Sequence, residues 1–473
     1  MDTSAQVPWY WKSLDFERLT RDFPPPPDYF RERFTASPQT IRTLQEQRFV
    51  ETMERAWQIP FFQRLWGEAG LKASDITGLA DLHKIPTYDV SHIRDSIALN
   101  PPFGDFMRIS PADSQELPIV LQTSGGTTGL PRPMLYSPKE RETMAILGGR
   151  RFFLHGIRPG DMVLVTYSFN LGNGGFAPRE AIWKYTGAIP VTTGSGANTP
   201  TRRQIEIVQA WKINVILGFA PYMRHMALVA RDELGLDPRK LGIKLIGTHG
   251  NREERESVED LWGCKTFDAY GAHDCGMVAA ECEAHAGLHV FDDCFYLEIL
   301  NPETGQLVPD GEAGVLHITT LYKYGAPLVR WNTNDILRRL PGNCPCGGTT
   351  SRLDHLIGRN DGMIKLRGVN VFPEAVGLAV LQDTRTTGEF FCFVDQVGEA
   401  KFDEMDVWVE AVNDGVDRAA LLADLERRLK EVTGVKLKVT VKAKGELDIH
   451  TGTSQVSKIK RVLDRRKVRR IKA

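Results

Sequence analysis

The stretch Leu121–Pro133, LQTSGGTTGLPRP, sets three glycines and four hydroxyl residues directly behind a short apolar run. Glycine has no Cβ and adopts positive φ easily, so successive backbone N–H groups of such a loop can converge on an anion. The run Leu117–Leu121 predicts a short buried strand, and Pro131 and Pro133 prevent a helix from following at once. Because the loop matches neither G-x-x-x-x-G-K-[ST] nor G-x-G-x-x-G, it predicts a phosphate-binding loop of another kind, with a glycine- and threonine-rich surface turn as the alternative.

Helices and strands alternate behind this loop. The hydrophobic spacing predicts helices at 139–155, 202–211 and 222–234 and strands at 162–167, 215–218 and 244–248. Such alternation is typical of parallel βαβ units, whose ligands gather at the carboxyl ends of the strands. The turns NLGNGGF (170–176) and THGN (248–251) follow two of these strands, so we expect several loops to face one crevice.

The two ends of the chain differ in their sequence patterns. Residues 41–66 carry an aromatic stripe at helical spacing, which is typical of a core helix. Short strands and turns from Val290 predict a β-rich subdomain, and from about Gly358 charged helices alternate with strands. The predicted fold class is α/β, with a large N-terminal domain (1–357) of βαβ and β-rich subdomains, a hinge near 358–361 and a small α+β C-terminal domain (358–473), whose mobility is implied by the family resemblance described below.

Composition excludes several classes of protein. The chain has 473 residues, a formal net charge of −1 and 42% hydrophobic residues, which is ordinary for a folded globular protein and indicates no nucleic-acid partner. The N-terminus lacks the basic and apolar regions of a signal peptide, and no run is long enough to span a membrane. We therefore expect a cytoplasmic protein without a membrane partner; a homodimer is one expectation for its oligomeric state.

Five motifs occur in an order that resembles the adenylate-forming acyl-CoA ligase superfamily. They are the glycine loop, DAYGAHD (268–274), RWNTND (330–335), GRND to KLRGVNVFP (358–373) and SKIKRV (457–462). Within that superfamily the chain is most similar to the phenylacetate–CoA ligase family, through ECEAHAGLHV (281–290), CPCGG (344–348) and RGVNVFP (367–373). The resemblance extends from about residue 118 to 462.

The resemblance implies a two-step reaction. A carboxylate and ATP first give an acyl-adenylate and pyrophosphate, and the thiol of coenzyme A then displaces AMP to form a thioester. The substrate would be an aromatic acid of the arylacetate type, such as phenylacetate or indoleacetate, and Mg²⁺ would accompany ATP. Chemistry of this kind needs charge shielding on three phosphates and in-line orientation of two anions.

The resemblance also assigns nucleotide contacts. The ATP- or AMP-binding set is Ser124, Gly125, Gly126, Thr127, Thr128, Gly129, Asp268, Tyr270, Gly271, Asp274, Asp335 and Arg359. In this set the glycine loop with Thr127 holds the β and γ phosphates, and Tyr270 stacks on adenine. Asp335 accepts the ribose hydroxyls, and Arg359 contacts ribose or phosphate.

Catalysis is assigned to Asp274 and Lys458, with Thr127 assisting. Asp274 would bind Mg²⁺, which prefers hard oxygen ligands. Lys458 would bridge the carboxylate and the α-phosphate during adenylation, and Asp361 would be the hinge about which the small domain rotates.

The motifs depart from the family pattern at several positions. Gly125 replaces a hydroxyl residue, and Leu130 stands where a lysine is usual, so that Arg132 is a candidate substitute. Asp274 replaces a glutamate and His273 a hydroxyl residue. Ser457 replaces the glycine before the catalytic lysine, and Lys460 lies close by.

A cluster of soft ligands is spread over the β-rich region. Cys282, His289, Cys344 and Cys346 supply the four donors of a closed tetrahedral zinc site, and some members of the resembled family carry zinc there. Seven cysteines without a secretory signal indicate reduced thiols or metal ligands. Rival ligands are His285, Cys275 and Cys294, and four unrelated buried residues are the alternative.

The acid-binding pocket is expected where the loops converge. Its predicted lining is Tyr136, Phe169, Gly172, Gly174, Ala220, Tyr222 and Gly250. The small residues of the 170–176 turn suggest room for a bulky or bicyclic ring.

Other functions stay open from sequence. An adenylating enzyme could pass the acyl group to an amine or a carrier protein, or an adenylyltransferase could stop at the adenylylated product. A non-catalytic nucleotide-binding protein is a further alternative, which Asp335, Arg359 and Lys458 argue against.

Overall fold

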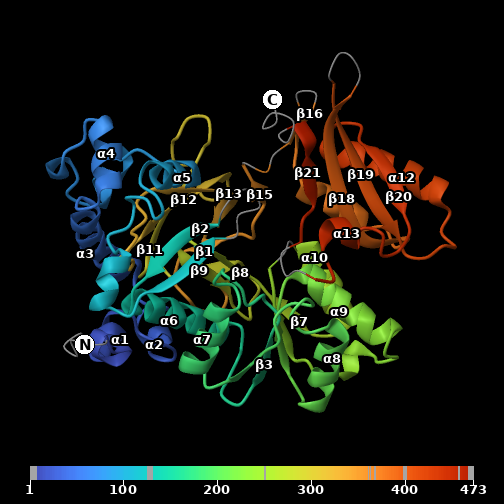
Figure 1. Ribbon diagram of the computed structural model, residues 1–473, viewed down its shortest axis with the longest axis horizontal. Helices are drawn as coiled ribbons and strands as arrows, with labels where there is room; N and C mark the ends of the chain where they lie inside the picture. The colour runs from blue at the N-terminus through green and yellow to red at the C-terminus, as the bar shows by residue number, and fades with distance from the viewer. Residues whose placement is uncertain are drawn as a thin grey trace, which may run out of the picture.

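The computed structural model describes residues 8–124, 131–249, 252–360, 362, 364–366, 369–397, 402–455 and 459–466. Figure 1 shows a larger body, which contains the chain from its N-terminus through the green and yellow segments, and a smaller body that holds the C-terminal elements. The mixed α/β class predicted from the sequence is confirmed. None of the helices in the described ranges is long and apolar enough to cross a membrane.

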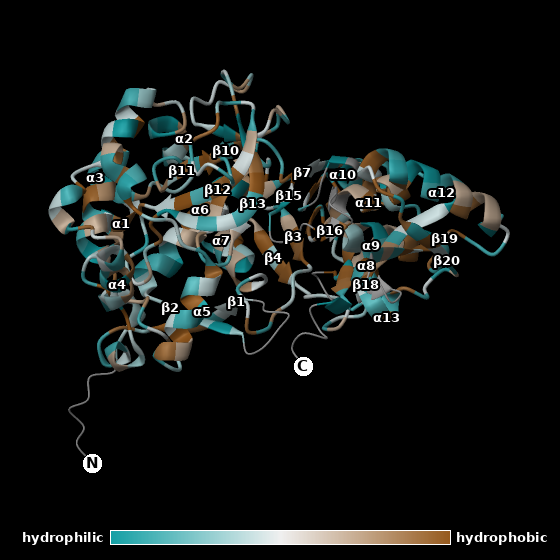
Figure 2. Ribbon diagram, turned by 90° about the horizontal axis from the view of Figure 1, so that it is seen from above, coloured by the Kyte–Doolittle hydropathy of each residue, from teal (hydrophilic) through white to brown (hydrophobic). Residues whose placement is uncertain are grey.

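A five-stranded parallel sheet lies at the centre of the larger body, in the order β4-β3-β5-β6-β7. Its strands are β3 (Met162–Val165), β4 (Ile189–Thr192), β5 (Val215–Leu217), β6 (Leu245–Gly247) and β7 (Lys265–Phe267). Inner strand residues such as Leu164 and Ile216 are fully buried, as expected where helices cover both faces of a sheet. The strands β3 and β4 accordingly appear brown in Figure 2. The predicted parallel βαβ units are thus present.

The helices of these units are close to their predicted positions. They are α6 (Pro138–Leu154), α7 (Phe176–Tyr185), α8 (Thr201–Ala210), α9 (Ala220–Asp232) and α10 (Arg252–Trp262). Helix α6 begins with a capping box, in which Ser137 and Glu140 satisfy each other's backbone N–H groups. Gly148 and Gly149 let α6 approach α7 closely, because a Cβ on either would lie 2.6 or 2.7 Å from a Cβ of α7.

The N-terminal region is helical but more interrupted than its periodicity suggested. Its helices are α1 (Phe16–Asp22), α2 (Asp28–Glu32), α3 (Pro38–Ala56), α4 (Pro60–Glu68) and α5 (Val90–Leu99). The single helix expected over residues 41–66 is wrong, since α3 ends at Ala56 and α4 begins at Pro60. Proline lacks the N–H needed inside a helix and disfavours helical geometry in the residue before it. The predicted role of the aromatic stripe in the core is correct, since Phe49 and Phe61 are buried.

An antiparallel hairpin carries the glycine loop. It consists of β1 (Val120–Ser124) and β2 (Arg132–Tyr136), with Ser124 opposite Arg132. The buried strand expected at 117–121 is wrong in position and burial, because Val120 and Leu121 are 41% and 46% exposed. Successive strand residues point to opposite faces, so both faces of the hairpin contact solvent at this end.

A second, largely antiparallel sheet forms the β-rich region, in the order β11-β12-β13-β14-β10-β9-β8, with β15 paired to β13. Its strands are β8 (Ala269–Ala272), β9 (Gly276–Glu281), β10 (Leu288–Val290), β11 (Phe295–Leu300), β12 (Ala313–Thr320), β13 (Trp331–Leu340), β14 (Arg352–Leu353) and β15 (Gly358–Arg359). The sheet begins earlier than Val290, because β8 and β9 already belong to it.

The C-terminal elements surround their own hydrophobic core. A four-stranded sheet has the order β20-β19-β18-β21, and β16 and β17 form a small hairpin. The elements are β16 (Ile364–Leu366), β17 (Val369–Val371), α11 (Pro373–Leu381), β18 (Thr386–Val397), β19 (Phe402–Ala411), α12 (Arg418–Thr433), β20 (Lys438–Lys442), α13 (Asp448–Thr451) and β21 (Val462–Asp464). In Figure 1 this body rests against α9 and α10.

Candidate functional site

The predicted phosphate loop joins β1 to β2. Its residues Gly125, Gly126, Thr127, Thr128, Gly129 and Leu130 lie outside the described residues, so their roles stay predictions. Ser124, the last residue of β1, is half-buried at the mouth of the loop. The hairpin is tied to the second glycine turn, because the Thr123 N–H donates to the carbonyl of Leu171 over 2.8 Å.

Arg141 of α6 strengthens this junction. Its Nη1 donates to Gln122 of β1 over 2.9 Å and to Asn173 of the glycine turn over 2.7 Å. One buried guanidinium therefore holds both loops at the same edge, as the topology predicted.

A buried ion pair lies beside the hairpin. Arg132 of β2 forms two hydrogen bonds with Asp274, of which the Nη2–Oδ2 contact measures 2.8 Å. Burial alone would raise the pKa of Asp274, but Arg132 holds that pKa below its ordinary value. Lys323 also donates to the backbone carbonyl of Asp274 over 2.7 Å.

This geometry gives Asp274 an ionised carboxylate that fits the hard-oxygen preference of Mg²⁺. Each oxygen keeps a lone pair beyond the one that Arg132 uses, so the group can accept a further partner. Arg132 is therefore the partner of Asp274 in the structure, whereas its predicted role in place of the missing lysine stays a prediction.

Asp335, Tyr270 and Arg359 form one cluster. Tyr270 Oη donates to Asp335 Oδ2 over 2.6 Å, and Arg359 Nη1 donates to Oδ1 over 2.6 Å. The β13–β15 pairing places Asp335 directly opposite Arg359. The structure thus brings together three residues that the motifs separate by up to 89 positions, as their numbers 270 and 359 show. The predicted contacts of these residues with ribose and adenine stay predictions.

Asp268 and Gly271 lie at the two ends of β8. The Asp268 carboxylate is held by His355 Nδ1 at 2.8 Å and by the N–H of Ala269 at 2.8 Å, so it anchors the start of the strand. A Cβ at Gly271 would lie 2.6 Å from the carbonyl oxygen of Gly276, so only glycine permits the close contact with β9 there.

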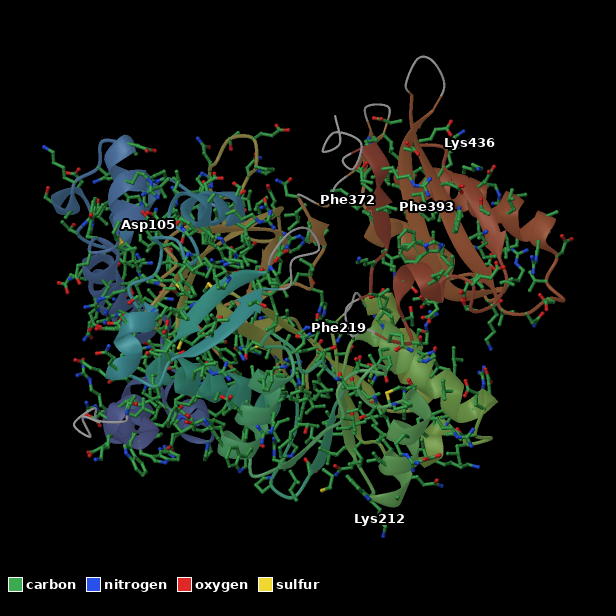
Figure 3. All side chains as sticks on the ribbon, in the orientation of Figure 1. Asp105, Lys212, Phe219, Phe372, Phe393 and Lys436 are labelled. Atoms are coloured by element: carbon green, nitrogen blue, oxygen red, sulfur yellow. The ribbon has the colours of Figure 1, made fainter. Side chains whose placement is uncertain are left out.

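A cavity of about 390 Å³ opens next to β8 and α6. Its apolar wall is formed by Met144, Phe152, Ala177, Pro178, Phe219 and Met277. Figure 3 labels Phe219, which lies between the parallel sheet and the start of α9. This volume is within the range of small-molecule binding sites, which is about 300–1,000 Å³.

The predicted pocket residues are placed differently by the structure. Gly174 lines the cavity, and the Tyr136 hydroxyl donates to the backbone of the lining residue His273 over 3.0 Å. Phe169 and Gly172 belong to the same turn without lining the cavity. Ala220 and Tyr222 lie instead in the core around α9, where the Tyr222 hydroxyl contacts Gln204 at 3.0 Å. Gly250 lies outside the described residues.

The polar side of this cavity is formed by Arg151, Tyr167, Ser168, Asn170, Asn173, His249 and His273. Asn170, Asn173 and His249 belong to the two turns that the sequence predicted to face one crevice, whereas Arg151, Tyr167 and Ser168 were not predicted. Burial lowers the pKa of His273 to about 4, and burial together with Arg151 lowers that of His249 to about 4. Both imidazoles are therefore neutral near pH 7.

A signal for Arg151 was present in the sequence. Two consecutive arginines interrupt the apolar helical run AILGGRRFFL at 145–154. Buried Arg150 pairs with Asp293 at 2.9 Å, whereas Arg151 has no carboxylate within ion-pair distance in the described part of the chain. Which arginine lacks a partner could be seen only in the structure.

The four predicted zinc ligands are brought together. The donor atoms of Cys282, His289, Cys344 and Cys346 all lie within 4.8 Å of one another. The Cys282 and Cys344 sulfurs are 3.7 Å apart, and Cys346 Sγ lies 3.3 Å from His289 Nε2. A tetrahedral zinc ion would separate two sulfurs by about 3.8 Å and a sulfur from a nitrogen by about 3.5 Å.

The surroundings of this cluster also fit zinc. His289 Nδ1 lies 2.9 Å from the Thr350 hydroxyl, which leaves Nε2 directed at the three sulfurs. The rival ligands lie elsewhere: His285 contacts Glu281, the backbone oxygen of Cys275 accepts from Tyr322, and Cys294 lies near Arg150. The donor set therefore fits a closed structural site.

The predicted hinge Asp361 and catalytic Lys458, with Ser457, lie outside the described residues. The described residues that flank Lys458 are well anchored. Lys460 N–H donates to Thr451 over 3.3 Å, and the Cys392 N–H donates to the Arg461 carbonyl over 2.8 Å.

Comparison with known proteins places this site in context. Residues 368–466 match the family model of the AMP-binding enzyme C-terminal domain. The chain is 31% identical over 446 residues to the phenylacetate-coenzyme A ligase of Aromatoleum evansii, covering 91% of this chain and 96% of that one. It is also 31% identical to the enzyme of the same name from Thermus thermophilus, over 93% of this chain and 100% of that one.

A solved structure with the same overall architecture is 2-hydroxyisobutyryl-CoA ligase, which is 26% identical. In its postadenylation state, with a bound acyl-AMP, it gives a TM-score of 0.83 over 94% of this chain and 95% of that one. In its thioesterification state the TM-score is 0.68 over 95% and 96%. The present arrangement therefore corresponds to the postadenylation state of that protein.

Proposed function

Because the chain belongs to the phenylacetate–coenzyme A ligase family and is an AMP-forming acid–CoA ligase, we propose that it activates an aromatic acid of the arylacetate type, such as phenylacetate or indoleacetate. ATP and coenzyme A are its co-substrates. The observation that carries the choice of acid is the cavity of about 390 Å³, whose apolar wall meets the nucleotide motif at Gly271 and His273.

The nucleotide would lie between the hairpin and the β-rich sheet. The loop after Ser124 would hold the β and γ phosphates, and Asp335, which Tyr270 and Arg359 hold in place, would accept the ribose hydroxyls. Asp274 would hold the Mg²⁺ that shields phosphate charge when it is bound. Arg132 keeps Asp274 ionised and adds positive charge at the same place.

The acid would enter the cavity ring first. Its carboxylate would then lie near His273, next to Asp274, while the ring packs against Phe219, Met277 and the 170–176 turn. Neutral His273 can act as a hydrogen-bond donor to the carboxylate without adding a formal charge. Holding the carboxylate and the triphosphate in this arrangement would align the carboxylate oxygen for in-line attack on the α-phosphate.

Zinc would have a structural role. Three thiolates and His289 Nε2 complete four ligands, which leaves no open position for a water or substrate. The site would link β9 and β10 to the 344–350 segment of the β-rich sheet.

The proposal is tested with a panel of acids in a pyrophosphate-release assay, followed by detection of the CoA thioester. We expect pyrophosphate release that depends on an arylacetate, and a thioester only when coenzyme A is added. A uniform preference for short aliphatic acids would contradict the choice of substrate. Accumulation of the acyl-adenylate without consumption of coenzyme A would favour transfer to an amine or a carrier protein instead.

A further inference from the structure

Arg151 is an unusual member of the cavity lining. Its side chain is only 2% exposed, yet Nε and Nη2 have no hydrogen-bond partner within the described ranges. The Tyr167 hydroxyl, which lines the same cavity and is also buried, likewise has no partner there. Burial raises the pKa of Tyr167 and Arg151 opposes that rise, so the guanidinium and the phenol are near neighbours on the cavity wall.

Buried polar groups without partners are rare, because each forfeits its hydrogen bonds to water. Arginine cannot escape this cost by losing its proton. A ligand or water in the adjoining cavity can supply such an acceptor. Arg151 and its neighbour Phe152 line the cavity from α6. Gly271, which belongs to the predicted nucleotide motif, lines it from β8.

We propose that the cavity selects an aromatic acid with an additional oxygen substituent, a ring hydroxyl or a second carboxylate, that accepts hydrogen bonds from Arg151 and meets the Tyr167 hydroxyl. This inference rests on the proposed function and narrows its substrate class. Arg151 is then a specificity-determining residue, since it pairs with the substituent and leaves the reacting carboxylate to the nucleotide site.

The test compares phenylacetate with hydroxyphenylacetates and carboxyphenylacetates in the pyrophosphate-release assay. We expect kcat/KM of the wild type to be about 10- to 100-fold higher for an oxygen-bearing acid, the gain typical of a hydrogen bond to a charged group. Greater gain from the carboxylate indicates recognition of charge, and greater gain from the hydroxyl indicates a neutral acceptor. Both support the proposal.

Arg151→Met should remove this preference, so that kcat/KM for the oxygen-bearing acids falls to the value for phenylacetate in the same variant. Met277→Leu, an apolar change in the same lining, is the matched control: it can change kcat/KM for all the acids together and should keep the ratio between them. Equal kcat/KM for all these acids in the wild type, or an unchanged preference in Arg151→Met, would overturn the proposal. The comparison of acids in the wild type tests the proposal even if the variant fails to fold. A wild type that activates no acid would reject the proposed function instead.

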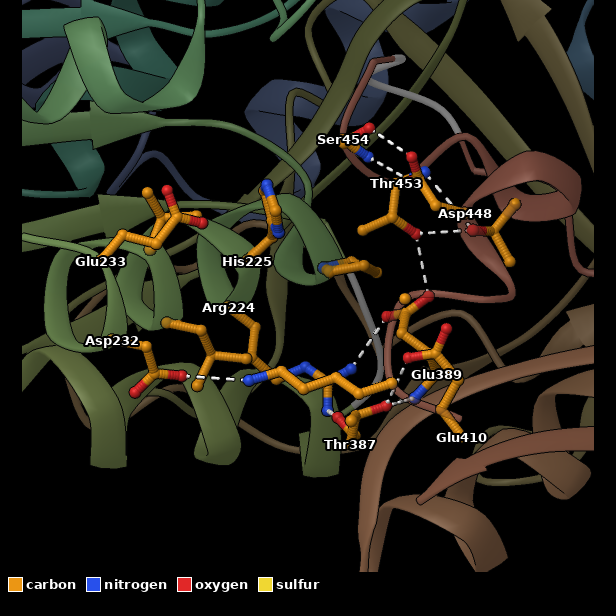
Figure 4. A pocket seen from close by; sticks show the side chains of 16 residues that line it. Arg224, His225, Asp232, Glu233, Thr387, Glu389, Glu410, Asp448, Thr453 and Ser454 are labelled. Atoms are coloured by element: carbon orange, nitrogen blue, oxygen red, sulfur yellow. Dashed lines mark hydrogen bonds and ion pairs between the residues drawn. The ribbon is translucent and has the colours of Figure 1, made fainter. Parts of the chain in front are cut away.

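A second, independent inference comes from Glu389 of β18. Its Oε2 accepts from Thr453 and from Arg461, each over 2.8 Å, and its Oε1 accepts from Arg224 over 2.9 Å. Thr453 and Arg461 lie on the two sides of Lys458 in the sequence, whereas Arg224 belongs to α9 of the larger body. Figure 4 shows Arg224, Glu389 and Thr453 meeting in the cavity between the two bodies.

The carboxylate of Glu389 is ionised in this network. Burial opposes the charge on Glu389, but Arg461 and Arg224 lower its pKa to about 2. Arg224 also donates to the carbonyl of Thr387, and the Ala197 N–H donates to the Gln455 carbonyl over 3.2 Å. The larger body therefore contacts both Glu389 and the segment before Lys458.

We infer that Glu389 is a positioning residue for adenylation, because it joins both flanks of the Lys458 segment to α9. Rotation of the C-terminal domain would break the contact with Arg224 but carry Thr453 and Arg461 along with Glu389. The contact thus stabilises the arrangement that corresponds to the postadenylation state and is absent once the domain has turned. This inference also rests on the proposed function.

The test measures the two half-reactions separately in the intact enzyme. Arg224→Met should slow formation of the acyl-adenylate about 10-fold, the loss expected from one hydrogen bond to a charged group, and leave thioester formation from added acyl-adenylate unchanged. Lys444→Met is the matched control, because it removes an exposed pair between the same bodies, Lys444 with Asp232 at 3.2 Å. That variant should leave both half-reactions unchanged.

Glu389→Gln adds a second readout. Combined with Arg224→Met, it should slow adenylation no further than the larger single effect, because both changes remove the same contact. Equal losses in both half-reactions, or no loss in adenylation, would overturn the inference. A wild type that forms acyl-adenylate and thioester keeps the proposed function intact in either case.

Discussion

Lys458→Ala should lower the rate of acyl-adenylate formation by about 100- to 1,000-fold, which is the loss typical of removing one group that stabilises developing charge. The ammonium would bridge two anions, the attacking carboxylate and the α-phosphate, and a flexible lysine can enter the site in one domain arrangement and leave it in the other. Thioester formation from preformed acyl-adenylate should change only a few-fold, because no charge then develops between those two groups. Single-turnover assays of each half-reaction measure both quantities.

Lys460→Ala is the matched control, since Lys460 lies two residues further along the same motif. It should retain most of the adenylation rate. A larger loss in Lys460→Ala than in Lys458→Ala would move the catalytic role to Lys460. Equal losses in both half-reactions of Lys458→Ala would remove the role assigned to Lys458.

The double substitution Cys344→Ser and Cys346→Ser should abolish zinc binding and strongly destabilise the β-rich region. Structural zinc contributes on the order of 10 kcal/mol to the stability of small zinc-bound folds, because the unfolded chain offers no preformed site. The four proposed ligands come from separate parts of the chain, namely Cys282, His289, Cys344 and Cys346. Loss of the ion would therefore release several strands at once. We expect about one zinc per chain in the wild type by elemental analysis, none in the variant, and a melting temperature more than about 10 °C lower.

Cys264→Ser serves as the control, because Cys264 is half-buried and lies outside the cluster. It should retain zinc and nearly all of the wild-type stability. Purified wild-type protein that contains no zinc and melts at the same temperature with and without a chelator would reject the zinc site.

Local patterns in the sequence predicted much of the architecture. Apolar runs that alternate with helical patterns located the parallel βαβ units, because a strand buried on both faces leaves a short continuous apolar run and a helix buried on one face leaves a period near 3.6 residues. The helix expected at 41–66 and the strand expected at 117–121 were wrong for local reasons as well. Pro60 interrupts the first, and the second overlaps the exposed start of β1 at Val120 and Leu121.

The α/β class, the order of the motifs and the four residues Cys282, His289, Cys344 and Cys346 proposed as a cluster could be read from the sequence, because these depend on residue type and spacing along the chain. Which charges meet depends on the tertiary structure. Arg132 pairs with Asp274, Arg150 with Asp293, and Glu389 with Arg224, while Arg151 is left facing a cavity. These partners are 142, 143 and 165 positions apart. A side chain's neighbours at that separation are set by how sheets and helices pack, and the local sequence carries no record of them.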